Sequence, residues 1–330
     1  MGLPPHEFSC SNDGNNDATY SAQTCVKSGY FKGGGTYVIK VASGGNPLPC
    51  NSGLLQIYSQ KTGKLEGLLL DEGILTEIRT AAVGALVAKH VMLPRQNRVG
   101  NDDDDVNDDN QEIVVGVVGT GIQARYQLHA IQTALPKCKR VYIWGRSSDK
   151  AMELRDELVG STSEGRIPWT SAQVVASANE LFQKCNLIVT TTSSREALLR
   201  WKDCSSATSA FERIHITCIG ADAPGKQELD PLLVSNTNML IADSMAQTCV
   251  RGEFQHAIRQ NLIQSSDIIP LGRFLEDPSA CARISEGNDT GDNTSSTVQL
   301  SIFDSSGVAL QDCIIAELVL EMLLPSPKND

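Results

Sequence analysis

A glycine-rich segment carries the clearest chemical signal in the sequence. Residues 119–124 read Gly-Thr-Gly-Ile-Gln-Ala, follow the apolar run at 113–118 and precede an expected helix at 123–133. In this order the first glycine allows a tight turn, the second lets the backbone approach a pyrophosphate, and the alanine keeps helix and sheet close. The N–H groups at the helix start then face phosphate oxygens. The pattern predicts a dinucleotide site, against the weaker alternative of a structural turn, at Gly119, Thr120, Gly121, Ile122, Gln123 and Ala124.

The residues after the second strand of such a unit select the cofactor. An acidic side chain there would bind a ribose 2′-hydroxyl and favour NAD. This sequence has Arg146, Ser147 and Ser148 instead, which suit a 2′-phosphate and favour NADP. Arg146 could also stack on adenine, and NAD and NADP would then bind alike. Small polar residues at later strand ends are also expected to line the cofactor, namely Thr191, Thr192, Ser193 and Gly220.

The order of the expected elements indicates an α/β fold. Strands and helices alternate after residue 112, which predicts a Rossmann-type doubly wound parallel sheet. Before it, alternating patterns predict a small antiparallel sheet, and an Ala-rich segment at 75–92 predicts a helix capped by Thr76. The expected strands lie at 36–43, 54–59, 65–71, 113–118, 141–145, 172–177, 186–192, 213–220, 238–244 and 298–305, and further helices at 148–158 and 310–323.

Composition narrows the classes of function. The 330 residues carry a net charge of −11, which argues against nucleic acid or an anionic membrane as a partner. Ten scattered cysteines without C-x-x-C or zinc spacing indicate reduced thiols and no metal site, and with no signal-peptide pattern the expected location is cytoplasmic. The first 35 or so residues are expected to be irregular, and the acidic stretch at 97–111 to be a solvated linker.

Five motifs in order resemble the ornithine cyclodeaminase/mu-crystallin family. They lie at residues 37–40, 71–82, 118–125, 220–230 and 306–312. The resemblance implies a homodimer of two-domain subunits. It divides the chain into a substrate and dimerisation domain of α+β type at 1–111, an NAD(P)-binding Rossmann domain at 112–308, and a last helix at 309–330 that returns to the first domain.

The same resemblance assigns roles to three side chains. Arg79, otherwise a solvated helix residue, would bind the substrate carboxylate. Lys40 would bind the carboxylate or carbonyl region and assist proton transfer. Asp222 follows a core strand, where a helix cap is the alternative, and would act as the general acid/base for the substrate amine. The family pattern also has an arginine upstream of these positions, whereas this sequence has none before Arg79.

Three functions fit these residues. The leading hypothesis is an NAD(P)-dependent cyclodeaminase that converts an amino acid such as ornithine to proline, releasing ammonia through an imine. The second is an NAD(P)H-dependent reductase of cyclic ketimines, or an amino acid dehydrogenase, and Arg146 favours reduction with NADPH. The third is a dinucleotide- or small-ligand-binding protein without turnover, which the missing arginine would favour.

Overall fold

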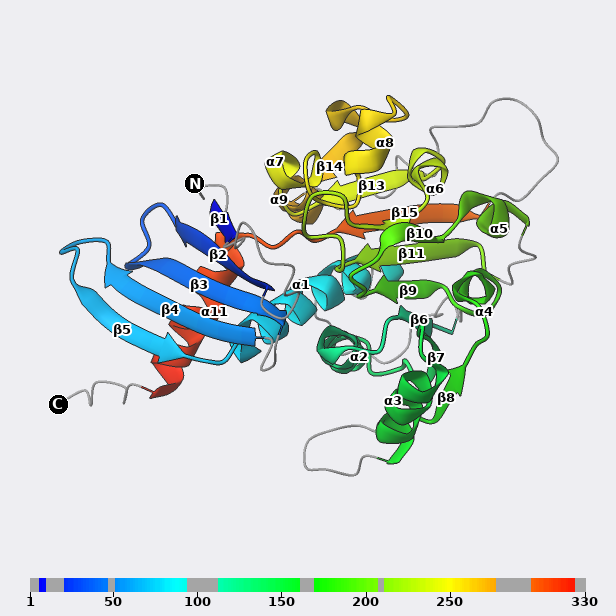
Figure 1. The fold of residues 1–330 in the computed structure, drawn as a ribbon, viewed down its shortest axis with the longest axis horizontal. Coiled ribbons are helices and arrows are strands. Elements are labelled where there is room, and N and C mark those ends of the chain that lie inside the picture. The colour runs from blue at the N-terminus through cyan, green and yellow to red at the C-terminus, as the bar shows by residue number, and fades with distance from the viewer. Residues whose placement is uncertain are drawn as a thin grey trace, which may run out of the picture. The chain divides into compact units, whose positions relative to one another are not determined.

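The computed structural model describes residues 6–9, 21–46, 51–93, 112–160, 169–206, 211–276 and 298–323. The chain divides into two compact units (Figure 1). Unit 1 comprises Met1–Thr80 and Gly307–Asp330, and unit 2 comprises Ala81–Ser306. The expected acidic linker at 97–111 lies outside the described residues.

Unit 1 is built on a five-stranded antiparallel sheet in the order β1-β2-β3-β4-β5. Its strands are β1 (His6–Ser9), β2 (Ser21–Tyr30), β3 (Thr36–Asn46), β4 (Asn51–Ser59) and β5 (Leu65–Leu70). Helix α11 (Ala309–Leu323) packs on one face, where its Cys313 and Ala316 join an apolar cluster with the strand residues Val38, Leu55 and Ile57. Because side chains alternate along a strand, the residues between these point to the opposite face.

Unit 2 contains an eight-stranded parallel sheet in the order β14-β13-β15-β11-β9-β6-β7-β8. Its strands are β6 (Val114–Val118), β7 (Arg140–Trp144), β8 (Ser171–Val174), β9 (Leu187–Thr190), β11 (Arg213–Cys218), β13 (Met239–Ala242), β14 (Ile268–Pro270) and β15 (Gln299–Asp304). Two short strands, β10 (Arg195–Leu199) and β12 (Gln227–Leu229), form a separate parallel pair.

Helices cover both faces of this sheet. Apolar residues of α2 (Ile122–Ala134) and α3 (Ser148–Gly160) share a cluster with Val115 and Val117 of β6, whereas α4 (Leu181–Lys184) and α8 (Gln255–Arg259) pack in a cluster with Val114 and Val118. This alternation confirms the predicted doubly wound α/β sheet and its continuous apolar strands. The remaining helices are α1 (Ile74–Met92), α5 (Trp201–Ser206), α6 (Pro231–Ser235), α7 (Met245–Thr248) and α9 (Leu271–Glu276), with 3₁₀ turns at Ala178–Glu180 and Ser265–Asp267.

Two local predictions were wrong. The first 35 residues were expected to be irregular, but Ser21–Tyr30 form strand β2, because the neighbouring β3 offers a full ladder of backbone partners. The helix expected at 75–92 begins at Ile74, and its first turn is capped by Asp71 rather than Thr76. The Leu75 backbone N donates to the Asp71 carboxylate at 2.8 Å.

Candidate functional site

The glycine turn in unit 2 has the geometry of a phosphate-binding loop. Gly119 has φ 120°, and a side chain there would bring Cβ within 2.5 Å of the Thr191 hydroxyl. Helix α2 starts at Ile122, and no side chain caps its first turn. The first N–H groups of a helix have no partner within the helix, and together with the helix dipole they favour an anion in front of this turn.

A cavity of about 350 Å³ opens over this turn. Eight of the predicted cofactor residues line it, namely Gly119, Thr120, Gly121, Arg146, Ser147, Thr191, Thr192 and Ser193. Trp144, Gly145, Lys150, Ser194 and Leu198 complete the lining. The glycines leave room for a backbone-to-phosphate approach, and the hydroxyls and cations suit ribose and phosphate, so the residues present fit a dinucleotide.

Five other predicted cofactor residues, Ser148 among them, do not line this cavity. Ala124 is fully buried between α2 and the sheet, as the third position of the motif requires. Ile122 is half exposed and Gln123 partly buried in the first turn of α2. Gly220 lies just beyond β11, and its N donates to the Glu228 carboxylate at 2.9 Å.

Two basic side chains follow strand β7 in the sequence. Arg146 and Lys150 both line the cavity, together with Ser147, whose hydroxyl accepts a hydrogen bond from the Lys150 backbone N at 3.4 Å. Ser148 begins α3 and does not line the cavity. The second cation, Lys150, lies two residues beyond Ser148 in the first turn of α3 and was not singled out from the sequence.

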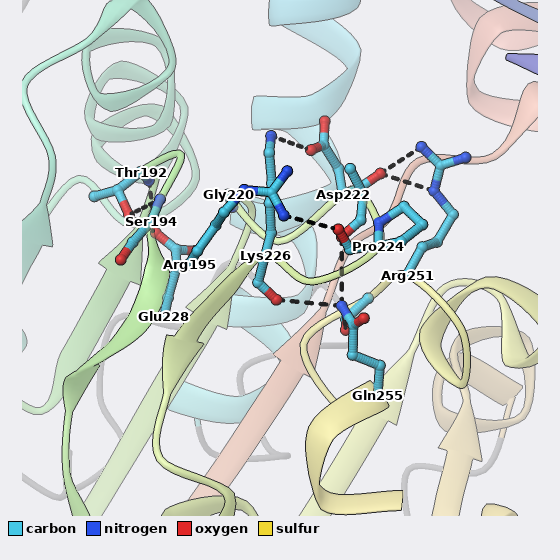
Figure 2. Close-up of polar contacts among 12 residues, drawn as sticks. Thr192, Ser194, Arg195, Gly220, Asp222, Pro224, Lys226, Glu228, Arg251 and Gln255 are labelled. Carbon is cyan, nitrogen blue, oxygen red and sulfur yellow. Dashed lines mark hydrogen bonds and ion pairs between the residues drawn. The ribbon is translucent and has the colours of Figure 1, made fainter. Parts of the chain in front are cut away.

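A loop held from several sides carries Asp222 (Figure 2). The Asp222 side chain is 54% exposed, and its Oδ1 lies 2.5 Å from Lys226 Nζ. The Asp222 carbonyl accepts from the Arg251 guanidinium at 2.8 Å, and Gln255 accepts from Gly225 N at 2.8 Å. A turn and β12 follow Pro224, and no helix of the described residues begins there, so Asp222 is not a helix cap.

In unit 1, two predicted substrate residues meet at one carboxylate. Lys40 Nζ and Arg79 Nε each lie 3.1 Å from Asp312 Oδ1, and all three side chains are buried. Arg79 Nη1 also donates to Gln311 at 2.6 Å. Burial and the neighbouring Arg79 lower the pKa of Lys40 to about 8, although Asp312 partly opposes this shift. Lys40 can therefore gain or lose a proton not far above neutral pH.

Sequence reasoning missed a third cation in this cluster. Lys27 on β2 lies directly opposite Lys40 on β3, and its Nζ donates to the Gly307 carbonyl at 3.0 Å. A Cβ on Gly307 would lie 3.2 Å from that Nζ and 2.8 Å from Arg79 Nη1, so Lys27 and Arg79 approach the same point. No local pattern in the sequence points to Lys27, because its place opposite Lys40 depends on the pairing of β2 with β3.

The histidines offer no catalytic arrangement among the described residues. His215 is fully buried, bonds to Ser301 and Thr217, and has its pKa lowered to about 3 by burial, so it is neutral. His256 bonds to the Lys226 carbonyl. In the part of the chain that the structure describes, no group of three His, Cys, Asp or Glu side chains could hold a metal. No helix there is long and apolar enough to cross a bilayer.

Fold and site together define a nicotinamide dinucleotide-binding Rossmann protein. The model of the ornithine cyclodeaminase/mu-crystallin family matches residues 43–326. An uncharacterised cyclodeaminase of Sinorhizobium fredii is 32% identical over 90% of this chain and 79% of its own length. The chain therefore belongs to the ornithine cyclodeaminase/mu-crystallin family, whose members are enzymes of the cyclodeaminase and imine reductase kind.

Two further proteins illustrate the range of the family. An alanine dehydrogenase of Archaeoglobus fulgidus is 30% identical over 85% of this chain and 74% of its own length. The fold also matches the iminosuccinate reductase of Paracoccus denitrificans, solved in complex with NAD⁺. That match has a TM-score of 0.70 and 23% identity, and covers 98% of this chain and 85% of the other.

Proposed function

We propose that the protein is an NAD(P)-dependent cyclodeaminase that converts an amino acid such as ornithine to a cyclic product such as proline, releasing ammonia. The observation that carries the proposal is the meeting of Lys40 and Arg79 at Asp312 in unit 1. The single buried carboxylate of Asp312 is shared by Lys40 and Arg79. Because Lys27 approaches the same region, the cluster has an excess of positive charge. Such a cluster suits the carboxylate of an amino acid.

In this proposal unit 1 is the substrate and dimerisation domain, and unit 2 is the cofactor domain. Arg79 offers the carboxylate a planar fork of donors, and Lys40 and Lys27 add ammonium groups. Lys27 takes the place of the upstream arginine that the sequence lacks. When bound, the nicotinamide would accept the α-hydrogen of the amino acid as hydride. Attack of the side-chain amine on the resulting imine would expel ammonia and close the ring, and the same hydride would then reduce the cyclic imine. Lys40, with a pKa of about 8, can move a proton near the carboxylate.

We assign Asp222 as the general base that takes a proton from the substrate ammonium. Its carboxylate is half exposed, and Arg251 and Gln255 fix the loop that carries it. Asp222→Asn should lower turnover about 10²–10⁴-fold with little change in thermal midpoint. Asp230→Ala is the control for a lost helix cap, since Asp230 caps α6, and should lower stability by about 0.5–2 kcal/mol with normal turnover. Near-normal turnover in Asp222→Asn would refute the assignment.

We also propose that NADP(H) binds more tightly than NAD(H). Arg146 and Lys150 bring two positive charges to the cavity beside the Ser147 hydroxyl, and none of the described residues that line it is acidic. Arg146→Ala and Lys150→Ala should each weaken NADP(H) selectively in direct titrations. Equal losses for NAD(H) would mean that the two side chains bind a group common to both cofactors.

A reductase of cyclic ketimines is the second candidate, and the two cations that suit NADPH favour it. Amino acid dehydrogenation and ligand binding without turnover are the other outcomes. A panel of amino acids and cyclic imines, assayed with NAD(H) and NADP(H) for both absorbance and ammonia, separates them. Ammonia release without net cofactor change supports the cyclodeaminase, net NADPH consumption with an imine supports the reductase, and tight cofactor binding without turnover supports the third.

A homodimer is proposed from the sheet face of unit 1 that lies opposite α11. Alternation places Ile39, Val41, Leu54, Leu68 and Leu70 on that face, and Leu68 and Leu70 are 53% and 75% exposed. Exposed apolar patches of this kind mark interfaces, and a second copy would pair sheet with sheet. Leu68→Glu should give a monomer in light scattering, whereas an unchanged dimer would place the interface elsewhere.

A cytoplasmic location is proposed from the cysteines. The seven that the structure describes are all free, as expected in a reducing compartment. Cell fractionation, with thiol labelling of the protein before lysis, tests the proposal. Recovery of the protein with membranes, or with its thiols oxidised, would contradict it.

A further inference from the structure

A buried carboxylate lies beneath the carboxyl ends of β9 and β11. Glu228 is fully buried, and its Oε1 accepts from Thr192 N at 2.6 Å and from the Thr192 hydroxyl at 2.8 Å. Its Oε2 accepts from Gly220 N at 2.9 Å (Figure 2), and it also accepts from the Thr190 hydroxyl at 2.7 Å. Each oxygen thus faces a backbone N–H, which can donate but never accept. Four donated hydrogen bonds favour the ionised form of Glu228.

A second buried acid, Glu253, lies against the backbone of Glu228. Glu253 Oε1 accepts from Leu229 N at 2.7 Å and Glu228 N at 3.0 Å, whereas Oε2 takes part only in the 3.1 Å contact to Glu228 N. Burial raises the pKa of both acids, and the charge of Glu228 raises that of Glu253 further. Two neighbouring buried carboxyls do not both ionise readily. Glu228 receives hydrogen bonds from four donor groups and Glu253 from two, so the negative charge is assigned to Glu228 and the proton to Glu253.

The position of Glu228 connects it with the cofactor. Thr190 ends β9, and Gly220 lies just beyond β11, while Thr192 lines the dinucleotide cavity. The sheet order places β9 and β11 on the side of β6 away from β7. In doubly wound sheets the dinucleotide crosses the point where strand order reverses, so its second half lies over these two strands. All four groups that donate to Glu228 are neutral, so its charge is not cancelled by a cation among them.

We propose that Glu228 is a positioning residue that favours the oxidised, cationic nicotinamide over the reduced, neutral one. The inference rests on the proposed cofactor binding. It adds an effect on the redox state of the nicotinamide, which the proposed contacts to the substrate carboxylate, the substrate amine and the 2′-phosphate do not provide. Oxidised nicotinamide loses its positive charge when it accepts hydride, so a fixed negative charge nearby acts on one form only. Glu228 also holds Thr192 and Gly220 in place, which affects both forms alike.

The test measures dissociation constants of NAD⁺, NADH, NADP⁺ and NADPH for the full chain and two variants. Glu228→Gln removes a charge. Glu253→Gln is the matched control, since it replaces a buried neutral acid by a neutral amide of the same shape. We expect the ratio of oxidised to reduced affinity to fall roughly tenfold in Glu228→Gln, for a charge acting over about 10 Å at an effective dielectric of about 20. In Glu253→Gln the ratio should stay within about twofold of wild type.

If Glu228→Gln weakens the oxidised and the reduced cofactor equally, the inference is overturned and Glu228 has a purely structural role. The inference is also overturned if Glu253→Gln changes the ratio of oxidised to reduced affinity as much as Glu228→Gln does. Failure of the wild-type chain to bind either form would overturn the proposed function as well. If Glu228→Gln does not fold, infrared difference spectra of wild type against Glu253→Gln decide the point. Loss of the carbonyl band of one protonated carboxyl is expected, and its persistence would place the proton on Glu228 and refute the inference.

Discussion

Replacing Asp312 by Asn tests whether one carboxylate holds the cation cluster of unit 1 together. Asp312 is 2% exposed, and its Oδ1 accepts from both Lys40 and Arg79 at 3.1 Å. The variant leaves two buried cations side by side without their counter-charge. Removing one partner of a buried ion pair costs about 3–5 kcal/mol, so we expect a loss of this size in the free energy of unfolding at pH 7. Lys40 limits the loss, because its pKa falls further without Asp312 and it can release its proton.

The assay is urea denaturation with and without a small 2-oxo acid. If the cluster binds carboxylates, the ligand should restore more stability to Asp312→Asn than to wild type, because it replaces the missing negative charge. Glu317→Gln, also on α11, is the matched control. The Glu317 carboxylate accepts from the Thr36 hydroxyl at 2.5 Å, and the carbonyl of Gln can still accept this bond, so the change should cost at most about 1 kcal/mol. An Asp312→Asn variant that is no less stable than Glu317→Gln would refute the reasoning.

Three further predictions concern single groups. Lys40 has a pKa of about 8, so affinity for a 2-oxo acid should fall as pH rises through that value. In titrations at several pH values, Lys40→Arg should abolish this fall in affinity up to about pH 10, because arginine stays charged. Burial raises the pKa of Asp304 from 3.8 to about 7, so this group binds more protons in the folded state and its contribution to stability is lost as pH rises across that window. The loss amounts to about 4 kcal/mol, and Asp304→Asn should flatten that part of the stability curve in denaturation at stepped pH; an unchanged slope would contradict the assignment. Gly119→Ala should weaken cofactor binding at least about tenfold and cost about 1–3 kcal/mol, because φ is 120°, whereas Gly272→Ala, where Cβ meets nothing, should bind normally.

The sequence was sufficient for the elements whose signal is local. The run at 113–118 with the G-x-G-x-x-A turn is β6, the turn and the start of α2, because hydrophobic periodicity and glycine spacing depend on neighbours in the chain. Strand β2 was missed because its polar and small residues have no apolar alternation. Its strand conformation depends on pairing with β3, which is a tertiary effect.

The parts of the site that join distant segments could not be predicted from local patterns. Lys27 contacts the Gly307 carbonyl across 280 residues, and only the return of the chain to unit 1 brings them together. Glu228 lies in a recognised motif, but its four donors come from the carboxyl ends of β9 and β11, which are brought together by the order of the strands in the sheet. Lys150 was passed over because its place on the cavity wall depends on the direction of α3.

The composition of unit 1 from two separated segments has a consequence for biosynthesis. Its sheet emerges from the ribosome first, but α11 follows only after the 226 residues of Ala81–Ser306. Until then Val38, Leu55 and Ile57 lack the helix that covers them. Unit 2 is continuous and can fold in the meantime, so the nascent chain carries an uncovered apolar sheet for most of its synthesis. A chain stalled before α11 would be a natural client for chaperones that bind apolar strands.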